Sequence, residues 1–500
     1  MYPVGWPLPI VTPGEYLLPP APTPQFASPQ DQNSNLQYPV LQPLLLYADW
    51  IPLSLACNLL DHYFTSSPFA PAYAQSPYVL SFVFQKRLVL DRTTPRQCQP
   101  ALLASMMCIA AQTIDDSAFT GVSFSRGTFY EEMQRLTEGL VNRTGTLDDV
   151  VTYIHLATVG STGEGNKWWT FASSLAQELK LGHELPSSPF DTRLLEATEV
   201  QREERRRVWW LLYITDRHLA LCYDRPLRFS DAECESLLQP MDDTEYQNGA
   251  IRAARNLEAQ SGFYECTGHG IYQYFLTLMR ILGEIVHLRH AGTYHQSGDG
   301  CGWGDNETRE IRHHLEFYEQ SLRIKKATEA ATAQSTIVTA YGMYLVQIIH
   351  LLLAGKWDSV DGDASRWEGS QGLTMATRRT VLASKALGDI IELDAGLALM
   401  PFFFGTYILR GSFWVLRLPE PEVPPKISLC EISLRAHQAC VVALGSLDST
   451  KQASDIRATF DIEKLTVGSE SFVSCAWIDR IIPRLSPVGL LVPDLQPDPL

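Results

Sequence analysis

Apolar residues recur along most of the chain at steps of three and four, the spacing that places them on one face of an α-helix. The segment 100–114, PALLASMMCIAAQTI, shows the pattern clearly, and Pro100 is well placed at the start of a helix. The same spacing recurs at 147–156, 168–181, 203–223, 271–288, 311–322, 337–353, 381–393 and 427–444. Strand-like alternation is scarce, and neither a βαβ rhythm nor an internal repeat occurs. The pattern predicts an all-α chain.

The two ends of the sequence depart from this pattern. Residues 1–46 hold 11 of the 31 prolines together with Gln, Ser and Asn, a composition that buries too little apolar surface to fold. We therefore predict a disordered Pro/Gln-rich segment at 1–46 and a large multi-helix domain at 50–450, with a core motif at 203–243. Residues 466–500 end in a stretch with five prolines, which predicts an irregular tail.

Three polar stretches interrupt the helical pattern. Residues 296–306 and 358–372 are rich in Gly, Asp and Ser, which predicts surface loops or inserts. Residues 160–167 read GSTGEGNK and superficially suggest a phosphate-binding loop. That motif requires Lys directly after the last Gly, whereas Asn166 intervenes here. We predict that this stretch is a flexible loop.

Composition limits the classes of function. The 500 residues are 45% hydrophobic and 19% charged, an ordinary mix for a folded protein, and the net charge of -16 argues against bulk attraction to nucleic acid. The ten cysteines form no C-x-x-C pair, which favours buried, reduced thiols. The segment 396–416 is the best membrane candidate, but Pro401 and Arg410 favour a buried core helix. No secretion signal is recognisable.

A search for catalytic and metal sites gives weak candidates only. None of the three aspartate pairs has a third carboxylate one helical turn after its first Asp, so solvated turns and helix ends are the favoured interpretation. Those pairs are Asp115-Asp116, Asp148-Asp149 and Asp242-Asp243. The adjacent His313 and His314 point to different sides of a helix, and His287 and His350 lie on apolar faces typical of core histidines. We predict no catalytic, cofactor-binding or metal-binding residue, and a function other than that of an enzyme.

The segment 203–231, EERRRVWWLLYITDRHLALCYDRPLRFSD, concentrates charge beside a very apolar helix face. It could be a catalytic cluster, a nucleic-acid-binding patch or the core of a helical scaffold. Arg206 and Arg207 can reach back to Glu203 and Glu204 at spacing three or four, which neutralises the arginines and weakens the nucleic-acid interpretation. Arg225-Pro226 is expected to end the helix, because a residue before proline is steered away from helical geometry.

Asp216, Arg217 and His218 lie beside that apolar face, where a charge must be paired. Our hypothesis is that Asp216 bonds Arg225 or a nearby arginine and holds the following turn against the helix. One carboxylate and one histidine without a visible partner are a weak signal of catalysis.

The same stretch resembles the middle homology region of fungal zinc-cluster transcription factors, and more narrowly that of the xylanolytic activators among them. The resemblance continues through Leu238-Gln-Pro-Met-Asp-Asp and runs in order from about 50 to 450. Examples are Leu55-Ala-Cys-Asn-Leu-Leu-Asp, Ala176-Gln-Glu-Leu-Lys-Leu-Gly, Met400-Pro-Phe-Phe-Phe-Gly and Arg435-Ala-His-Gln-Ala-Cys-Val-Val. The structural and regulatory motif then comprises Arg206, Arg207, Trp209, Trp210, Asp216, Arg217, His218, Arg225 and Pro226.

The resemblance implies a helical regulatory domain of a nuclear activator. Such an activator switches on xylanase, cellulase and pentose-catabolism genes, transcribed by RNA polymerase II, in response to sugar inducers. The implied partners are promoter DNA, related factors in a homo- or heterodimer, transcription co-regulators and a sugar-derived effector, with no role for a membrane.

The sequence departs from the family in several places. The family binds DNA through six cysteines that hold two zinc ions, and these 500 residues contain no such cluster, so we assign no zinc or other cofactor. Either the sequence begins late, or the protein is a paralogue that kept only the regulatory part. His183 and the run 228–230 also depart from the family pattern, which puts the inducer response in question.

Two alternatives from other classes stay open. One is a DNA-free paralogue that modulates full-length relatives by dimerisation. The other is a helical enzyme or small-molecule-binding protein with a cavity inside its bundle.

Overall fold

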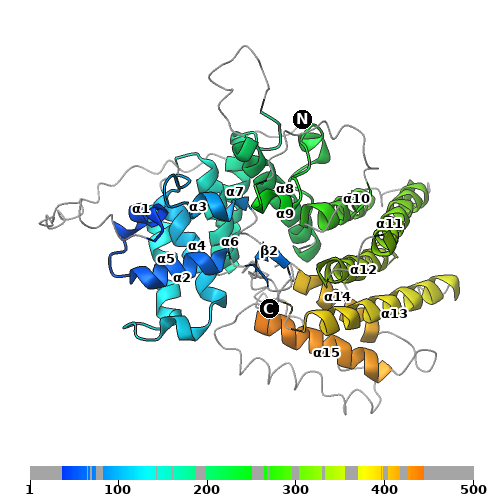
Figure 1. Cartoon of the computed structure of the whole chain (residues 1–500). Coiled ribbons are helices and arrows are strands. Elements are labelled where there is room, and N and C mark those ends of the chain that lie inside the picture. The colour runs from blue at the N-terminus through cyan, green and yellow to red at the C-terminus, as the bar shows by residue number, and fades with distance from the viewer. Residues whose placement is uncertain are drawn as a thin grey trace, which may run out of the picture. The chain divides into compact units, whose positions relative to one another are not determined.

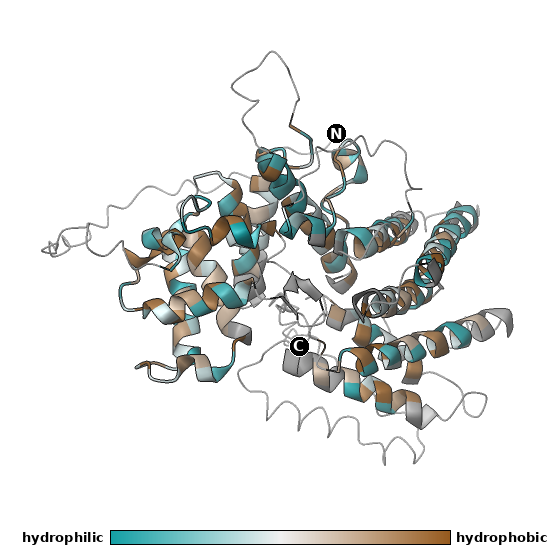
Figure 2. Cartoon of the chain, viewed as in Figure 1, coloured by the Kyte–Doolittle hydropathy of each residue, from teal (hydrophilic) through white to brown (hydrophobic). Residues whose placement is uncertain are grey.

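The all-α fold predicted from the sequence is confirmed in the computed structural model of the chain (Figure 1). The structure describes residues 37–64, 66–67, 70–74, 83–141, 144–159, 162–185, 199–223, 225–249, 264–266, 271–294, 303–328, 333–354, 370–395, 397, 404–416 and 426–443. Brown and teal residues mix along the same helices in Figure 2, as amphipathic helices require. None of the helices in these ranges combines the length and apolarity needed to cross a bilayer.

The N-terminal helices pack around α4 (Pro100–Thr113), which contacts α1, α2, α5 and α6. Helix α4 begins at Pro100, as predicted, and its residues from 101 to 111 are all buried. Because these residues are small or medium-sized, neighbouring helices can approach on several sides. The other elements of this part are η2 (Pro39–Leu41), α1 (Gln42–Leu45), α2 (Leu53–Tyr63), α3 (Lys86–Val89), η4 (Asp116–Phe119), α5 (Arg126–Leu140), α6 (Leu147–Val159) and α7 (Thr162–Glu178).

A buried histidine joins three of these helices. His155 of α6 lies 3.0 Å from the hydroxyl of Tyr63 on α2 and 2.7 Å from that of Ser105 on α4. Burial lowers the pKa of His155 to about 3, so the imidazole is neutral at physiological pH. It therefore acts as a hydrogen-bonded core residue.

The C-terminal helices pack around α12 (Ala333–Ala354), which contacts α10, α11, α13 and α14. Helix α12 ends at Ala354, directly before Gly355, and glycine often follows the end of an α-helix. The other helices of this part are α10 (Leu276–Tyr294), α11 (Trp303–Thr328), α13 (Ser370–Leu393), α14 (Phe404–Leu416) and α15 (Lys426–Ala443). A π-helical turn, η6 (Ile271–Phe275), directly precedes α10. The segment predicted as a buried core helix contains α14, in which Phe404, Tyr407, Ile408 and Val415 are buried.

Helix α8 (Glu199–Tyr223) contacts α6 of the first group and α10 of the second. It is followed by η5 (Asp231–Cys234) and α9 (Asp243–Gln247). A short antiparallel pair, β1 (Ser66–Ser67) and β2 (Ala70–Ala74), aligns Ser66 with Ala74 and Ser67 with Ala70. These are the only strands in the described residues, so they leave the fold class unchanged.

The predicted boundary at residue 46 is wrong. Residues 37–46 contain η2 and α1, and Val40, Leu41 and Leu44 are buried. The local prolines, Pro39 and Pro43, occupy first-turn positions of these two helices, where proline is tolerated. Proline content alone therefore placed the start of the folded part too late, while residues 1–36 and the predicted tail at 466–500 lie outside the described residues.

The predicted loops also need correction at their edges. The stretch 160–167 was expected to be a flexible loop, but residues 162–167 form the first turns of α7. Likewise, α11 begins at Trp303 inside the predicted loop 296–306, and α13 begins at Ser370 inside 358–372. In each case a helix extends into polar sequence because the apolar residues that follow anchor it by packing.

Six cysteines in the described residues are buried thiols, as predicted. They are Cys57, Cys98, Cys108, Cys234, Cys266 and Cys430.

Candidate functional site

Helix α8 is the centre of the segment that the sequence singled out. It runs from Glu199 to Tyr223 and so starts four residues before the predicted Glu203, but it ends before Arg225-Pro226 as predicted. Every residue from 206 to 221 is buried. The helix therefore presents an unusual number of charged side chains to the protein interior, each of which needs a partner.

Arg206 and Arg207 of α8 point inward and pair with Glu203, as predicted. Glu203 accepts from Arg206 at 3.3 Å and from Arg207 at 2.9 Å, one helical turn away. Its Oε1 atom also accepts from the backbone N–H of Met241 at 2.9 Å. Glu203 thus ties the segment before α9 to α8.

Each of the two arginines also bonds outside α8. Arg206 donates to both oxygens of Glu184, at 2.6 and 2.9 Å, in a bidentate pair. Arg207 donates to Asp243 at 2.6 Å and to the carbonyl of Met241 at 2.6 Å. Its guanidinium also lies 3.9 Å from the ring centre of Tyr246, and neither Arg207 nor Asp243 has an exposed side-chain surface. These residues form a buried ion network, not a basic surface patch.

The prediction that Glu204 neutralises these arginines is wrong. Glu204 pairs with Arg96, whose Nε lies 3.0 Å from Glu204 Oε1. Arg96 also donates to Asp148 at 2.7 Å at the start of α6. Burial raises the pKa of Glu204 above its ordinary value, and Arg96 only partly offsets that shift. Arg96 is far from Glu204 in sequence, so local spacing did not indicate this pair.

The aspartate pairs are only partly as predicted. They do lie at turns and helix ends, and Asp115 caps η4 by accepting from the N–H of Ser117 at 2.8 Å. Asp148, Asp149 and Asp243, however, are buried instead of solvated. Asp148 and Asp243 bond arginines, and Asp149 accepts from the N–H of Thr146 at 2.9 Å. These carboxylates are structural.

The hypothesis that Asp216 bonds Arg225 is confirmed, at 3.2 Å. Asp216 is fully buried, and its Oδ2 atom also accepts from the backbone N–H groups of Arg228 at 2.8 Å and Phe229 at 3.1 Å. Arg217 lies 3.5 Å away. We call Asp216, Arg225, Arg228 and Phe229 the Asp216 cluster. It holds the turn after α8 against the helix, whereas Pro226 itself is exposed.

Arg217 also bonds the segment after α8, whereas His218 faces α14. Arg217 donates to Asp231 at 2.7 Å and lies 3.3 Å from the ring centre of Tyr213, whose hydroxyl donates to Asp231 at 2.6 Å. His218 lies beside Tyr407 of α14, with ring centres 6.0 Å apart. Burial lowers the pKa of His218 to about 3, and the positive charge of Arg410 adds to that effect. The imidazole is therefore neutral.

The two tryptophans fix the chain on either side of the charged residues. Trp210 donates its indole N–H to the carbonyl of Leu238 at 2.8 Å. Trp209 packs against Phe229, with ring centres 4.9 Å apart. A Cβ atom at Gly182 would stand 2.8 Å from the Trp209 ring, so only glycine fits that position without a shift. The aromatic residues thus hold the loops before and after α8 close to it.

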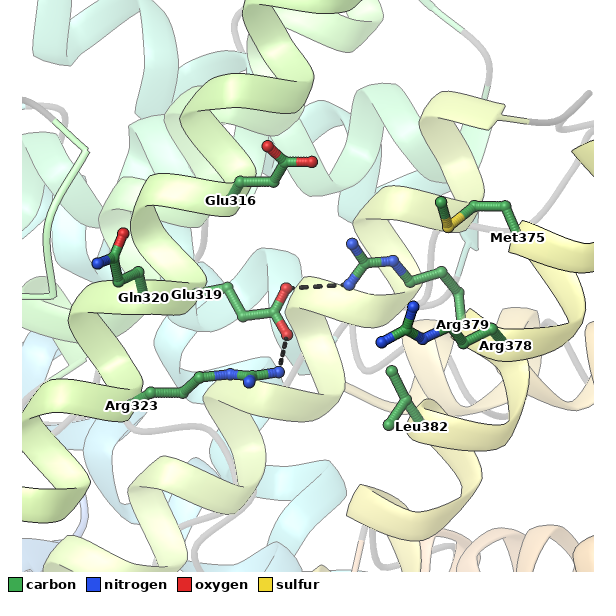
Figure 3. Close-up of a pocket in the computed structure, with 8 residues that line it drawn as sticks. All are labelled: Glu316, Glu319, Gln320, Arg323, Met375, Arg378, Arg379 and Leu382. Atoms are coloured by element: carbon green, nitrogen blue, oxygen red, sulfur yellow. Dashed lines mark hydrogen bonds and ion pairs between the residues drawn. The ribbon is translucent and has the colours of Figure 1, made fainter. Parts of the chain in front are cut away.

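A second feature, which the sequence did not indicate, is a pocket of about 410 Å³ between α11 and α13 (Figure 3). Helix α11 contributes Glu316, Glu319, Gln320 and Arg323, and α13 contributes Met375, Arg378, Arg379 and Leu382. Glu319 accepts from Arg323 at 2.7 Å and from Arg379 at 2.9 Å. No motif could have revealed the pocket, because its two walls are about 60 residues apart in sequence and each alone resembles a solvated helix face.

The histidines give no metal site in the described part of the chain, where no group of three His, Cys, Asp or Glu could hold an ion. His314 lies 3.0 Å from Glu284 and stacks on Tyr264. His350 is buried, as predicted, 3.8 Å from Glu319, and burial lowers its pKa to about 3. The same prediction is wrong for His287, which is exposed on α10.

Comparison with known proteins finds one family profile that matches part of the chain. Residues 153–329 match the profile of the fungal specific transcription factor domain, which begins within α6, includes α8 and ends just after α11. No solved structure matches the chain.

The chain is also similar to whole curated proteins. It is 36% identical to the xylanolytic transcriptional activator xlnR of Aspergillus clavatus and to that of Aspergillus niger, and 37% identical to that of Emericella nidulans. The alignments cover 88% of this chain but 57%, 59% and 61% of those relatives, respectively. The chain thus spans about three fifths of the length of the relatives it matches. The chain is therefore similar, over residues 153–329 and over most of its length, to regulators that carry a fungal specific transcription factor domain.

Proposed function

We propose that this chain is the regulatory part of a nuclear transcription activator that controls genes for xylan breakdown, and with them the cellulase and pentose-catabolism genes. The observation that carries the proposal is the 36% identity to xylanolytic transcriptional activators over 88% of the chain. The buried ion network of α8 supports a scaffold role for the family segment, because its charged groups bond one another.

Binding to promoter DNA would not use the arginine run of α8. Arg206 and Arg207 are buried, and Arg205 donates to the carbonyl of Leu179 at 2.8 Å. An arginine can neutralise a DNA phosphate only where its guanidinium is accessible. We therefore propose that promoter binding requires a zinc cluster outside these 500 residues. In a gel-shift assay the purified chain should not bind a promoter fragment specifically, and tight, salt-sensitive binding would contradict this part of the proposal.

Regulation would act through other molecules instead of catalysis. We propose a homo- or heterodimer with related factors, contacts with transcription co-regulators and response to a sugar-derived effector. The carboxylates of α8 bond arginines and backbone N–H groups, which supports a structural role for them, and we propose that the chain is not an enzyme and holds no cofactor.

The direct test fuses the chain to an unrelated DNA-binding domain and measures a reporter gene in a fungal host, with and without xylan-derived sugars. The DNA-binding domain alone is the control. The proposal predicts that the fusion raises reporter output under inducing conditions, and equal output from fusion and control would contradict it. A different result is that the fusion leaves reporter output unchanged while co-expression of this chain changes the reporter output of a full-length relative. That result would favour the alternative function, in which the chain modulates relatives by dimerisation.

A further inference from the structure

The pocket between α11 and α13 has the size and the lining of a binding site for a small molecule. Its volume of about 410 Å³ falls in the range of roughly 300–1,000 Å³ that is usual for ligand pockets. Eight side chains line it, and three of these are arginines. We propose that this pocket binds a small hydroxylated organic anion, with a carboxylate or phosphate group on the arginines. This inference goes beyond the function proposed above and does not depend on it.

The arginines have donors to spare. An arginine carries five N–H groups. Arg379 uses only Nη1, which donates to Glu319 at 2.9 Å and to Gln347 at 2.8 Å, and Arg323 uses only Nη2, which donates to Glu319 at 2.7 Å. Arg378 is exposed on α13 and forms no ion pair or hydrogen bond with another residue of the described ranges. Its guanidinium points into the space between the two helices (Figure 3).

The floor of the pocket is already organised. Glu319 is 7% exposed and accepts from Arg323, Arg379 and Gln347. Burial raises the pKa of Glu319, but the hydrogen bonds from the two arginines outweigh it and leave the pKa below its ordinary value. Glu319 is therefore ionised and keeps two guanidinium groups in place, so a ligand would not have to order them.

The charges favour an anion of limited size. Three arginines against two glutamates give the lining a net charge of +1, opposite in sign to the net charge of the whole chain. Guanidinium groups bind carboxylate and phosphate through paired N–H donors. Glu316 and Gln320, both exposed on α11, offer oxygen acceptors for hydroxyl groups, and Met375 and Leu382 supply apolar contact. A neutral sugar would leave the spare N–H groups of the arginines unmatched.

The test measures binding to the purified chain by isothermal titration calorimetry. The probes are gluconate, glucose 6-phosphate, inorganic phosphate and uncharged glucose. We expect gluconate or glucose 6-phosphate to bind and glucose not to bind. Gluconate alone would identify a carboxylate ligand, and glucose 6-phosphate alone would identify a phosphate ligand. If inorganic phosphate binds as tightly as glucose 6-phosphate, the hydroxyl contacts assigned to Glu316 and Gln320 are wrong.

Variants then locate the site. Arg378→Gln should weaken binding about tenfold or more, because a charge-assisted contact is lost, without changing the melting temperature of the free chain. Arg309→Gln is the matched control, since Arg309 is exposed on α11 two turns before Glu316 and outside the pocket. Lack of binding by every anion, or equal binding by the Arg378→Gln variant, would overturn the proposal. Both outcomes are measured by ligand binding and not by transcription. The pocket proposal can therefore fail while the proposed function, tested by the reporter assay, stands.

Discussion

Replacing Asp216 is the sharpest test of the interpretation of α8. Its Oδ2 atom accepts two backbone N–H groups, from Arg228 at 2.8 Å and Phe229 at 3.1 Å, and its Oδ1 atom accepts from Arg225 at 3.2 Å. Asp216→Ala removes these three bonds and the longer one from Arg217 at 3.5 Å, and it leaves the N–H of the buried Phe229 without an acceptor. Asp216→Asn keeps one carbonyl oxygen that can still accept both backbone groups, so it removes chiefly the ion pair.

The geometry sets the expected magnitudes. Breaking a buried ion pair costs about 3–5 kcal/mol, and an unsatisfied buried donor costs about 1–3 kcal/mol. Arg225 has 31% of its side chain exposed and can turn towards water, which lowers the first figure. We therefore expect Asp216→Ala to lower the free energy of unfolding by about 3 kcal/mol, and Asp216→Asn by about 1 kcal/mol.

Urea denaturation followed by tryptophan fluorescence measures both values, and Trp209 lies directly beside the cluster against Phe229. Hydrogen exchange gives a local readout, because the amides of Arg228 and Phe229 should lose protection in the Ala variant and keep it in the Asn variant. Glu235→Ala is the control, since Glu235 is exposed. A stability of Asp216→Ala within about 0.5 kcal/mol of the wild-type value would refute the reasoning.

Three further predictions concern the same core. Arg207→Met should lower the free energy of unfolding by about 3–5 kcal/mol because it strands the buried Asp243, and adding Asp243→Leu should restore part of that loss, as measured in a double-mutant cycle. Stability should fall as the pH drops below 6.5, because the unfolded chain protonates His155 whereas its folded pKa is about 3. Between pH 7.5 and 5.5 the loss should be smaller in His155→Gln by about 1.4 kcal/mol, as urea midpoints at the two pH values would show, and an equal loss in both proteins would contradict this. Gly182→Ala should destabilise by about 1–3 kcal/mol through contact with Trp209, whereas Gly139→Ala, on an open face of α5, should stabilise slightly in thermal denaturation. Equal melting temperatures for these two variants would argue against the close packing at Gly182.

The sequence predicted the parts of this structure that depend on near neighbours. The end of α8 before Pro226 follows from local sterics, and the pairing of Glu203 with Arg206 and Arg207 follows from one helical turn. The Asp216–Arg225 pair could also be predicted, because a buried charge nine residues from an arginine across a turn has few other partners.

Partners distant in sequence could not be found in this way. Arg96 is 108 residues from Glu204, and Asp243 is 36 residues from Arg207, so neither pair has a spacing that a single sequence can reveal. The same limit explains why Asp148 and Asp243 were expected in water. Residues 37–46 were predicted wrongly for another reason: their composition resembles that of residues 1–36, whereas four buried side chains fix them to the fold.

The pair between Arg96 and Glu204 bears on how this protein can be divided. The matched family segment, 153–329, begins within α6 and excludes both Arg96 and Asp148. A fragment cut at those limits would lose the first turns of α6 and strip Glu204 of its counter-ion inside an apolar core. The segment that matches the family profile is therefore smaller than the unit that folds. Recombinant fragments of this protein need to start before η2 (Pro39–Leu41), so that the buried carboxylates keep their counter-ions and the helices stay complete.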